Sequence, residues 1–189
     1  MKHLIIYTHL NPNSFAKAVA DEVESAAAGK GHEIKSIDLY AEKFNPILEF
    51  PDIQYSFMNG DAPEDVKAYQ QQISWADQIT FIYPLWWGHM PAMLKGFIDR
   101  VFSNGFAYTY DENGPKGLLE GKSVHQFINT GNPSEVLSEN GMHDAIRKEQ
   151  EGGIFGFCGM KAETTFFGNI IMSTEQDRKD YLNSIKAIV

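Results

Sequence analysis

Residues 78–92, Gln-Ile-Thr-Phe-Ile-Tyr-Pro-Leu-Trp-Trp-Gly-His-Met-Pro-Ala, decide the predicted fold of this chain. The apolar run from Ile79 to Tyr83 indicates a buried strand that ends at Pro84, because proline cannot donate to a sheet ladder. A helix is expected to begin at Pro91, since proline suits a first helical position. The two adjacent tryptophans then lie at the carboxyl end of a strand, where open α/β sheets bind ligands. Packing of both rings in the core is the alternative.

The same alternation of apolar strands and amphipathic helices extends along the chain. The predicted strands are His3–Thr8, Glu33–Asp38, Gln78–Tyr83, Ser123–Asn129 and Ala162–Phe167, and the predicted helices lie near residues 15–28, 66–76, 91–102 and 174–188. This alternation predicts one α/β domain over residues 1–189, with a five-stranded parallel sheet covered by helices on both faces. A flavodoxin-like three-layer sandwich with strand order 2-1-3-4-5 is the natural arrangement.

Residues 40–60 lack a clean hydrophobic period and are expected to form an irregular excursion. The five aromatic residues between Tyr40 and Phe57 argue against disorder. After this excursion, Asp61 and Glu64 have the spacing of a capping box before the helix predicted near residues 66–76.

Composition excludes several classes of function. The net charge of -9, from 16 basic and 25 acidic residues, would repel nucleic acid and anionic membranes. No apolar run approaches the roughly 20 residues of a membrane span, so no membrane insertion is expected. The single cysteine, Cys158, favours a reduced, cytoplasmic setting, and no metal-ligand spacing is visible.

Three loops are predicted to meet at the carboxyl edge of the sheet, after the first, third and fourth strands. The first ends at Ser14, where a helix N-terminus can bind an anion, although Ser14 as a simple N-cap is the alternative. It matches neither a P-loop nor the dinucleotide-binding glycine pattern. The third contains Gly131, which permits close backbone approach to a ligand; a plain turn is the alternative. An anion site, an aromatic wall and an amide-rich loop together match the phosphate, ring and pyrimidine edge of flavin mononucleotide (FMN).

Specific motifs then point to a known family. The segments Tyr83–Trp87, Pro91–Phe102 and Gly105–Tyr108 resemble the signature of the flavodoxin-like NAD(P)H:quinone oxidoreductases. The first loop is similar to that family's His-x-x-x-x-Ser-Phe segment, and Thr130-Gly131 lies where the family carries a Thr-Gly loop. The resemblance covers nearly the whole chain, which looks like a short member of the bacterial type.

The resemblance implies a role for each matching residue. It places His9, Ser14, Phe15 and Ala16 around the flavin phosphate side, Pro84, Leu85, Trp86 and Trp87 along the isoalloxazine ring, and Thr130, Gly131 and Asn132 along its polar edge. His143 is implied to be catalytic, beside the reduced flavin, while Tyr108 and Tyr110 would reach the substrate pocket of the partner in a homodimer. Leu137 departs from the larger relatives, which carry a tyrosine there, so His143 and backbone amides would have to act without it.

The expected function follows from this resemblance. FMN is favoured over FAD because the chain is short, and NAD(P)H is the expected co-substrate. Two electrons would pass to a quinone-like acceptor in a ping-pong cycle. The alternatives are a flavodoxin-type one-electron carrier and a regulatory flavoprotein subunit of a potassium-efflux system.

Overall fold

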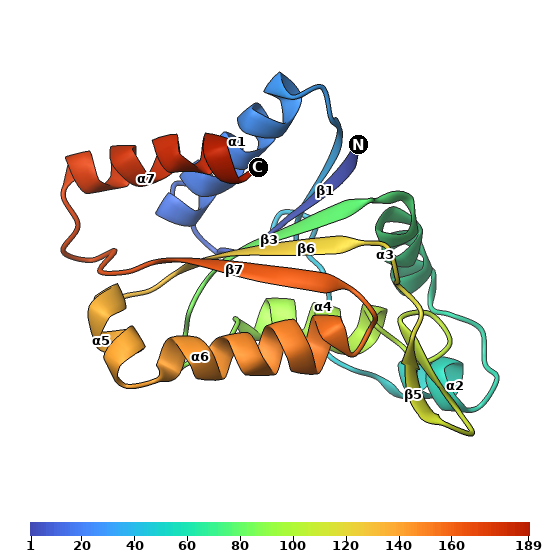
Figure 1. The fold of residues 1–189 in the computed structure, drawn as a ribbon. Helices are drawn as coiled ribbons and strands as arrows, with labels where there is room; N and C mark the ends of the chain where they lie inside the picture. The colour runs from blue at the N-terminus through green and yellow to red at the C-terminus, as the bar shows by residue number, and fades with distance from the viewer.

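The computed structural model describes residues 1–189 and is built around a five-stranded parallel sheet (Figure 1). Its strands are β1 (Lys2–Tyr7), β2 (Glu33–Asp38), β3 (Gln78–Pro84), β6 (Ser123–Asn129) and β7 (Lys161–Phe167). They lie in the order β2-β1-β3-β6-β7, which confirms the predicted order 2-1-3-4-5. The central strands are apolar on both faces, as expected of a sheet that is covered twice.

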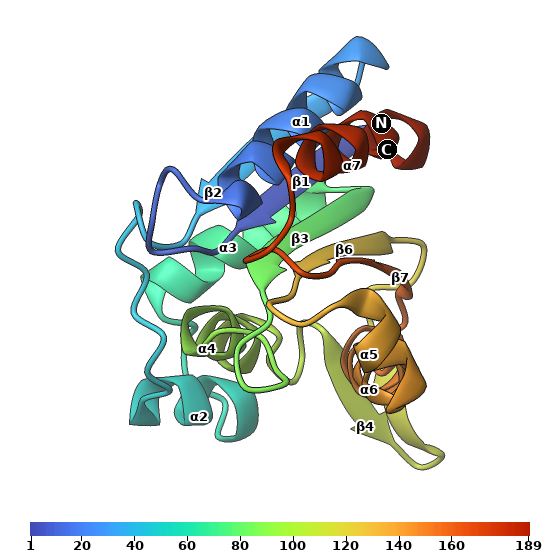
Figure 2. The same ribbon diagram turned by 90° about the vertical axis from the view of Figure 1, so that its left-hand side faces the viewer.

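Helices cover the two faces of the sheet in separate layers (Figures 1 and 2). One layer holds α1 (Phe15–Gly29) and α7 (Glu175–Ile188); the other holds α3 (Glu64–Trp75), α4 (Ala92–Val101), α5 (Ser134–Glu139), α6 (Met142–Arg147) and the π-helix η1 (Lys148–Gly156). Alternate residues of β1 enter different cores: Leu4 and Ile6 pack on the α3/α4 side, Ile5 and Tyr7 on the α1 side. No helix has the length and apolar character needed to span a bilayer.

Prolines set the start of two of these helices. The predicted capping box of Asp61 and Glu64 is wrong, because Pro63 is the N-cap of α3 and no side chain caps the helix. Ala62 precedes that proline, and the helical region is disfavoured for such a residue, which opposes an earlier helix start. Pro91 is likewise the N-cap of α4 rather than its first helical residue, one position from the prediction.

Three regions contain elements that were not predicted. Between β6 and β7 the chain forms α5, α6 and η1, where no helix was predicted. Within residues 40–60 lies the helix α2 (Phe50–Phe57), whose true capping box joins Glu49 and Asp52. Between α4 and β6 the chain forms an antiparallel hairpin of β4 (Tyr108–Asp111) and β5 (Gly114–Gly117).

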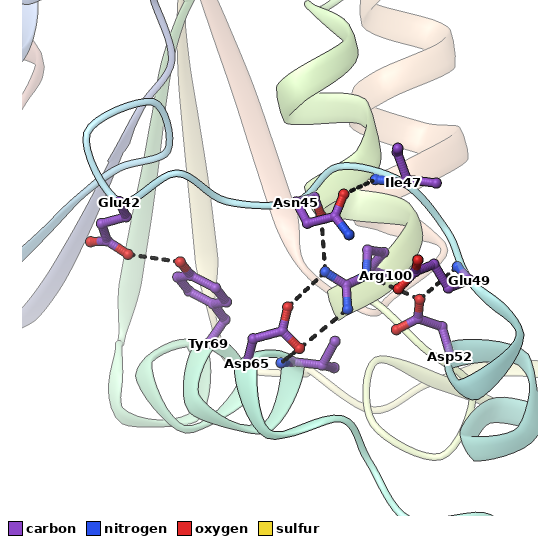
Figure 3. A network of polar contacts seen from close by, with 9 residues as sticks. Glu42, Asn45, Ile47, Glu49, Asp52, Asp65, Tyr69 and Arg100 are labelled. Carbon is purple, nitrogen blue, oxygen red and sulfur yellow. Dashed lines mark hydrogen bonds and ion pairs between the residues drawn. The ribbon is translucent and has the colours of Figure 1, made fainter.

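A buried guanidinium attaches the excursion to the sheet's helical layer (Figure 3). From α4, the Nε of Arg100 donates to Asp52 on α2 at 3.0 Å, and its Nη1 donates to Asp65 on α3 at 2.7 Å and to the Asn45 carbonyl at 2.9 Å. Backbone packing is equally close, since a Cβ on Gly96 would lie 2.1 Å from a main-chain oxygen of the excursion. The Arg100 side chain therefore binds the excursion to α4, and the absence of a side chain at Gly96 lets the two backbones approach closely.

Candidate functional site

Two adjoining hollows lie at the carboxyl edge of the sheet and share Leu85 and Gly131. The first hollow, about 290 Å³, is lined by His9, Ser14, Phe15, Ala16, Pro84, Leu85, Trp86, Asn129, Gly131, Ile170 and Ile171. The second hollow, about 300 Å³, is lined by Leu85, Trp87, Gly88, Thr130, Gly131, Asn132, Leu137 and Met142. All the predicted cofactor-binding residues therefore line one hollow or the other.

Ser14 holds the first loop together as well as lining the first hollow. It is the N-cap of α1, and its Oγ accepts a hydrogen bond from the Lys17 amide at 3.2 Å. The Tyr7 hydroxyl donates its only proton to the Asn11 carbonyl at 3.1 Å, so Ser14 must donate to the Tyr7 oxygen, 2.9 Å away. The N-cap interpretation of Ser14 is thus confirmed, and its hydroxyl proton is used inside the loop.

Other groups of this loop remain available to an anion. The amides of Phe15 and Ala16, in the first turn of α1, donate to no protein acceptor. His9 accepts a hydrogen bond from the Asn11 amide through Nδ1 at 2.9 Å, which leaves the proton of the neutral ring on Nε2. Partial burial lowers the pKa of His9, so the neutral ring prevails at pH 7. The loop offers two backbone donors and one imidazole donor.

The tryptophans lie in a tight turn rather than in the core. Trp86 and His89 exchange both backbone hydrogen bonds, at 2.9 and 3.0 Å. The two residues between them, Trp87 and Gly88, have φ angles of 52° and 77°, the geometry of a type I′ turn. Trp87 is fully exposed and Trp86 is 38% exposed, so core packing does not explain the pair. A bulky residue at positive φ costs on the order of 1 kcal/mol and is typical of functional sites.

The third loop presents backbone donors to the second hollow. Thr130 is buried and its hydroxyl donates to the Asn132 carbonyl at 2.9 Å, which shapes the turn around Gly131. The amides of Gly131 and Asn132 donate to no protein acceptor. This arrangement suits a ligand edge that carries carbonyl oxygens.

Asn129 is a site residue that sequence reasoning missed. It ends β6 opposite Pro84, lines the first hollow and is only 4% exposed. Neither the oxygen nor the nitrogen of its side-chain amide has a hydrogen-bond partner. A buried amide of this kind fits a ligand with hydroxyl and carbonyl groups, as a flavin has on its ribityl chain and pyrimidine ring. Its position as the last residue of a central strand was the available signal.

The loop after β7 also belongs to the site and was not predicted. Its Asn169 and Ile170 amides donate to the carbonyls of Asn132 at 2.8 Å and Thr130 at 3.0 Å. Ile170 and Ile171 then line the first hollow. The predicted strand ended at the right residue, Phe167, but nothing in the composition of the next residues indicated a fourth site loop.

Three predicted residues lie outside the two hollows. His143, on α6, is buried, its ring stacks on Phe166 with centroids 4.0 Å apart, and its Nε2 has no partner. Burial, followed by the charge of Arg147, lowers its pKa. Tyr108 and Tyr110 lie on the β4 hairpin, with Tyr108 in a separate groove between α4 and η1 and Tyr110 exposed. The structure thus gathers the predicted cofactor-binding residues but not these.

Comparisons with known proteins agree with this geometry. The family model described as having a flavodoxin-like fold matches residues 1–189. A Haemophilus influenzae protein described as an uncharacterized NAD(P)H oxidoreductase is 39% identical, over 95% of this chain and 89% of its own length. NAD(P)H dehydrogenase [quinone] 1 of Rattus norvegicus is 33% identical over 84% of this chain, which spans 65% of the rat protein.

A solved structure gives the same result in three dimensions. The NAD(P)H:quinone oxidoreductase from Methanothermobacter marburgensis superposes with a TM-score of 0.90 and 26% identity, covering 99% of this chain and 96% of that one. The match extends over all the elements that form the hollows. This chain belongs to the flavodoxin-like family that includes the NAD(P)H:quinone oxidoreductases.

Proposed function

We propose that this chain is a flavin-dependent NAD(P)H:quinone oxidoreductase, with a single FMN-binding domain over residues 1–189. The observation that carries the proposal is the buried, unpartnered amide of Asn129, a residue that lines a hollow bordered by free backbone donors and by tryptophan. A polar group buried without a partner costs free energy that a bound ligand would recover. The family relationship to NAD(P)H oxidoreductases supports the same activity.

Each part of the site has a task under this proposal. Bound FMN would supply the two-electron hydride chemistry. The amides of Phe15 and Ala16 and the His9 imidazole would bind its phosphate. The free amides of Gly131 and Asn132 would stabilise negative charge on the pyrimidine edge, because donors fixed in place need no reorganisation. NAD(P)H and a quinone-like acceptor would occupy the same exposed face in turn, in a ping-pong cycle.

His143 is proposed as the catalytic side chain. Its ring is held neutral by burial, and its orientation is fixed by the stack on Phe166. Nε2 is buried and has no hydrogen-bond partner in the protein, so a donor or acceptor group of a bound ligand could satisfy it. Replacing His143 with alanine should lower kcat by about 100-fold or more, in the range seen when one preorganised donor is removed. Unchanged turnover would exclude His143 from the mechanism.

We further propose a homodimer in the cytoplasm. Tyr108 and Tyr110 lie outside the hollows of their own chain, on a hairpin that projects from the sheet, and Tyr110 is exposed. In a dimer they would complete the substrate pocket of the partner. Light scattering of the purified protein should give twice the chain mass, and Tyr110→Ala should raise KM for the acceptor. An active monomer would contradict the dimer.

The direct test is the spectrum of the purified protein. A bound flavin should give a yellow protein, and acid release should yield FMN. NADH or NADPH should bleach the flavin within the turnover time, and a soluble quinone should restore the colour. A one-electron carrier would bleach slowly with both nicotinamides, and a protein that stays colourless with added FMN would overturn the proposal.

A further inference from the structure

The π-helix η1 contacts the two ends of the tryptophan loop, residues 83–89, through two adjacent residues. Glu149 Oε1 lies 3.2 Å from Nε2 of His89, at the far end of the type I′ turn. The side chain of Gln150, which is buried, is hydrogen bonded to the hydroxyl of Tyr83. Tyr83 directly precedes Pro84, where the chain leaves the sheet. One turn of η1 therefore contacts the loop at both of its ends, at Tyr83 and at His89.

The turn at Trp87 and Gly88 is stabilised by such a contact, because few other interactions hold it. Trp87 is fully exposed, so no packing fixes its indole. The turn is closed by the two backbone hydrogen bonds between Trp86 and His89, while Trp87 itself has a positive φ of 52° that a large side chain adopts at a cost. A bond from the His89 side chain to a separate helix opposes opening of this turn.

η1 is well suited to hold both ends. It is a nine-residue π-helix, a rare form that is frequently found at functional sites. Its neighbouring residues take different directions here: Gln150 faces the buried end of β3, whereas Glu149 reaches the solvent side of the turn. The second hollow, lined by Trp87, lies beside this turn.

We propose that His89 and Glu149 are positioning residues that hold Trp87 at the second hollow and thereby set how tightly a flat substrate binds there. The substrate part of this inference rests on the proposed function, whereas the positioning part concerns the protein alone. Neither residue touches the reacting atoms in this assignment. Their effect is expected on binding rather than on the chemical step.

The positioning part can be tested on the flavin-free protein by amide hydrogen exchange. In Glu149→Ala, the Trp86 and His89 amides should exchange about two- to fivefold faster, the range expected for losing a half-exposed side-chain hydrogen bond. Glu149→Gln keeps an acceptor and should restore part of the protection. Glu151→Ala is the matched control, because Glu151 lies on the same helix but pairs with Arg147, and it should leave both amides unchanged. Equal exchange in all the variants would overturn the proposal.

The substrate part requires the FMN-loaded enzyme. His89→Ala and Glu149→Ala should each raise KM for NAD(P)H or for the quinone about two- to fivefold, with kcat nearly unchanged. The double variant should be no worse than either single one, because the two residues act as a unit. Additive effects, or a fall in kcat with KM unchanged, would overturn the assignment. Failure to bind FMN would instead contradict the proposed function and leave the exchange result standing.

Discussion

Asn129 lines the first hollow, and neither polar atom of its buried side-chain amide has a hydrogen-bond partner. Its stability effect and its binding effect should therefore have opposite signs. Leucine has a similar shape and no polar atoms, so Asn129→Leu should leave the flavin-free protein as stable as before or stabilise it by about 1 kcal/mol. The same change should weaken FMN binding by about 10- to 100-fold, because two hydrogen bonds to the ligand are lost.

Thermal unfolding of the flavin-free protein and fluorescence titration with FMN measure the two effects of this substitution. Asn183→Leu, the same change on the exposed face of α7, is the control and should alter FMN affinity little. An Asn129→Leu protein that binds FMN normally would show that this amide is not a ligand. Lower stability of the flavin-free variant would show that the amide has a protein partner.

At the scale of elements, Arg100 joins α2, α3 and α4 through buried charge (Figure 3). Burial alone would raise the pKa of Asp65, but the Arg100 guanidinium holds it below its usual value. Burial alone would lower the pKa of Arg100, but the carboxylates of Asp52 and Asp65 raise it. Arg100→Met should lower the free energy of unfolding by about 3–5 kcal/mol, because it leaves Asp52 buried without its cation. Urea unfolding measures this loss.

Asp65→Asn provides a graded comparison for the arginine variant. The Asp65 side chain is 45% exposed, whereas that of Asp52 is 3% exposed. Loss of the exposed charge should therefore cost about 1 kcal/mol or less. The double variant Arg100→Met, Asp52→Leu should recover much of the loss, since neither charge then remains buried. Equal losses for Arg100→Met and Asp65→Asn would contradict the importance of the buried Asp52 pair.

The short helix α2 and the strand β5, both missed from the sequence, depend on contacts with other segments of the chain. The five strands and the long amphipathic helices follow from local hydrophobic period, and their bounds were predicted within a few residues. The short helix α2 depends on Asp52 meeting Arg100 from α4, which no local pattern encodes. β5 reads Gly-Pro-Lys-Gly and has no strand propensity, and it is stabilised by pairing with β4.

At the scale of the whole molecule, topology made the site predictable. Once the strand order is known, the loops after β1, β3 and β6 must meet, and the residues expected there do line the hollows. The topology does not show which polar groups find a hydrogen-bond partner. Asn129 is identified as a site residue by having no partner, and Ile170 by backbone bonds to another loop. Both facts exist only in three dimensions.

The opposite end of the sheet carries a buried histidine that should control the acid stability of the whole molecule. His3 is fully buried on β1, and its Nε2 lies 2.8 Å from the Thr80 hydroxyl. Burial, followed by the nearby His32 and His125, lowers the pKa of His3 to about 4. The unfolded chain, with an ordinary histidine pKa of about 6.5, then binds more protons than the folded protein between these two values.

Stability should therefore fall as the pH drops from about 6.5 to 4, and this one residue should account for about 2 kcal/mol of the loss by pH 5. His3→Gln keeps a hydrogen-bonding group opposite Thr80 but cannot take up a proton. Urea unfolding at pH 7 and pH 5 should show a smaller decrease for the variant, by about that amount. Carboxylates titrate in both proteins and cancel in the comparison. Equal decreases in the free energy of unfolding of the two proteins would mean that the pKa of His3 is the same in the folded and unfolded states. The burial of His3 would then have no effect on acid stability.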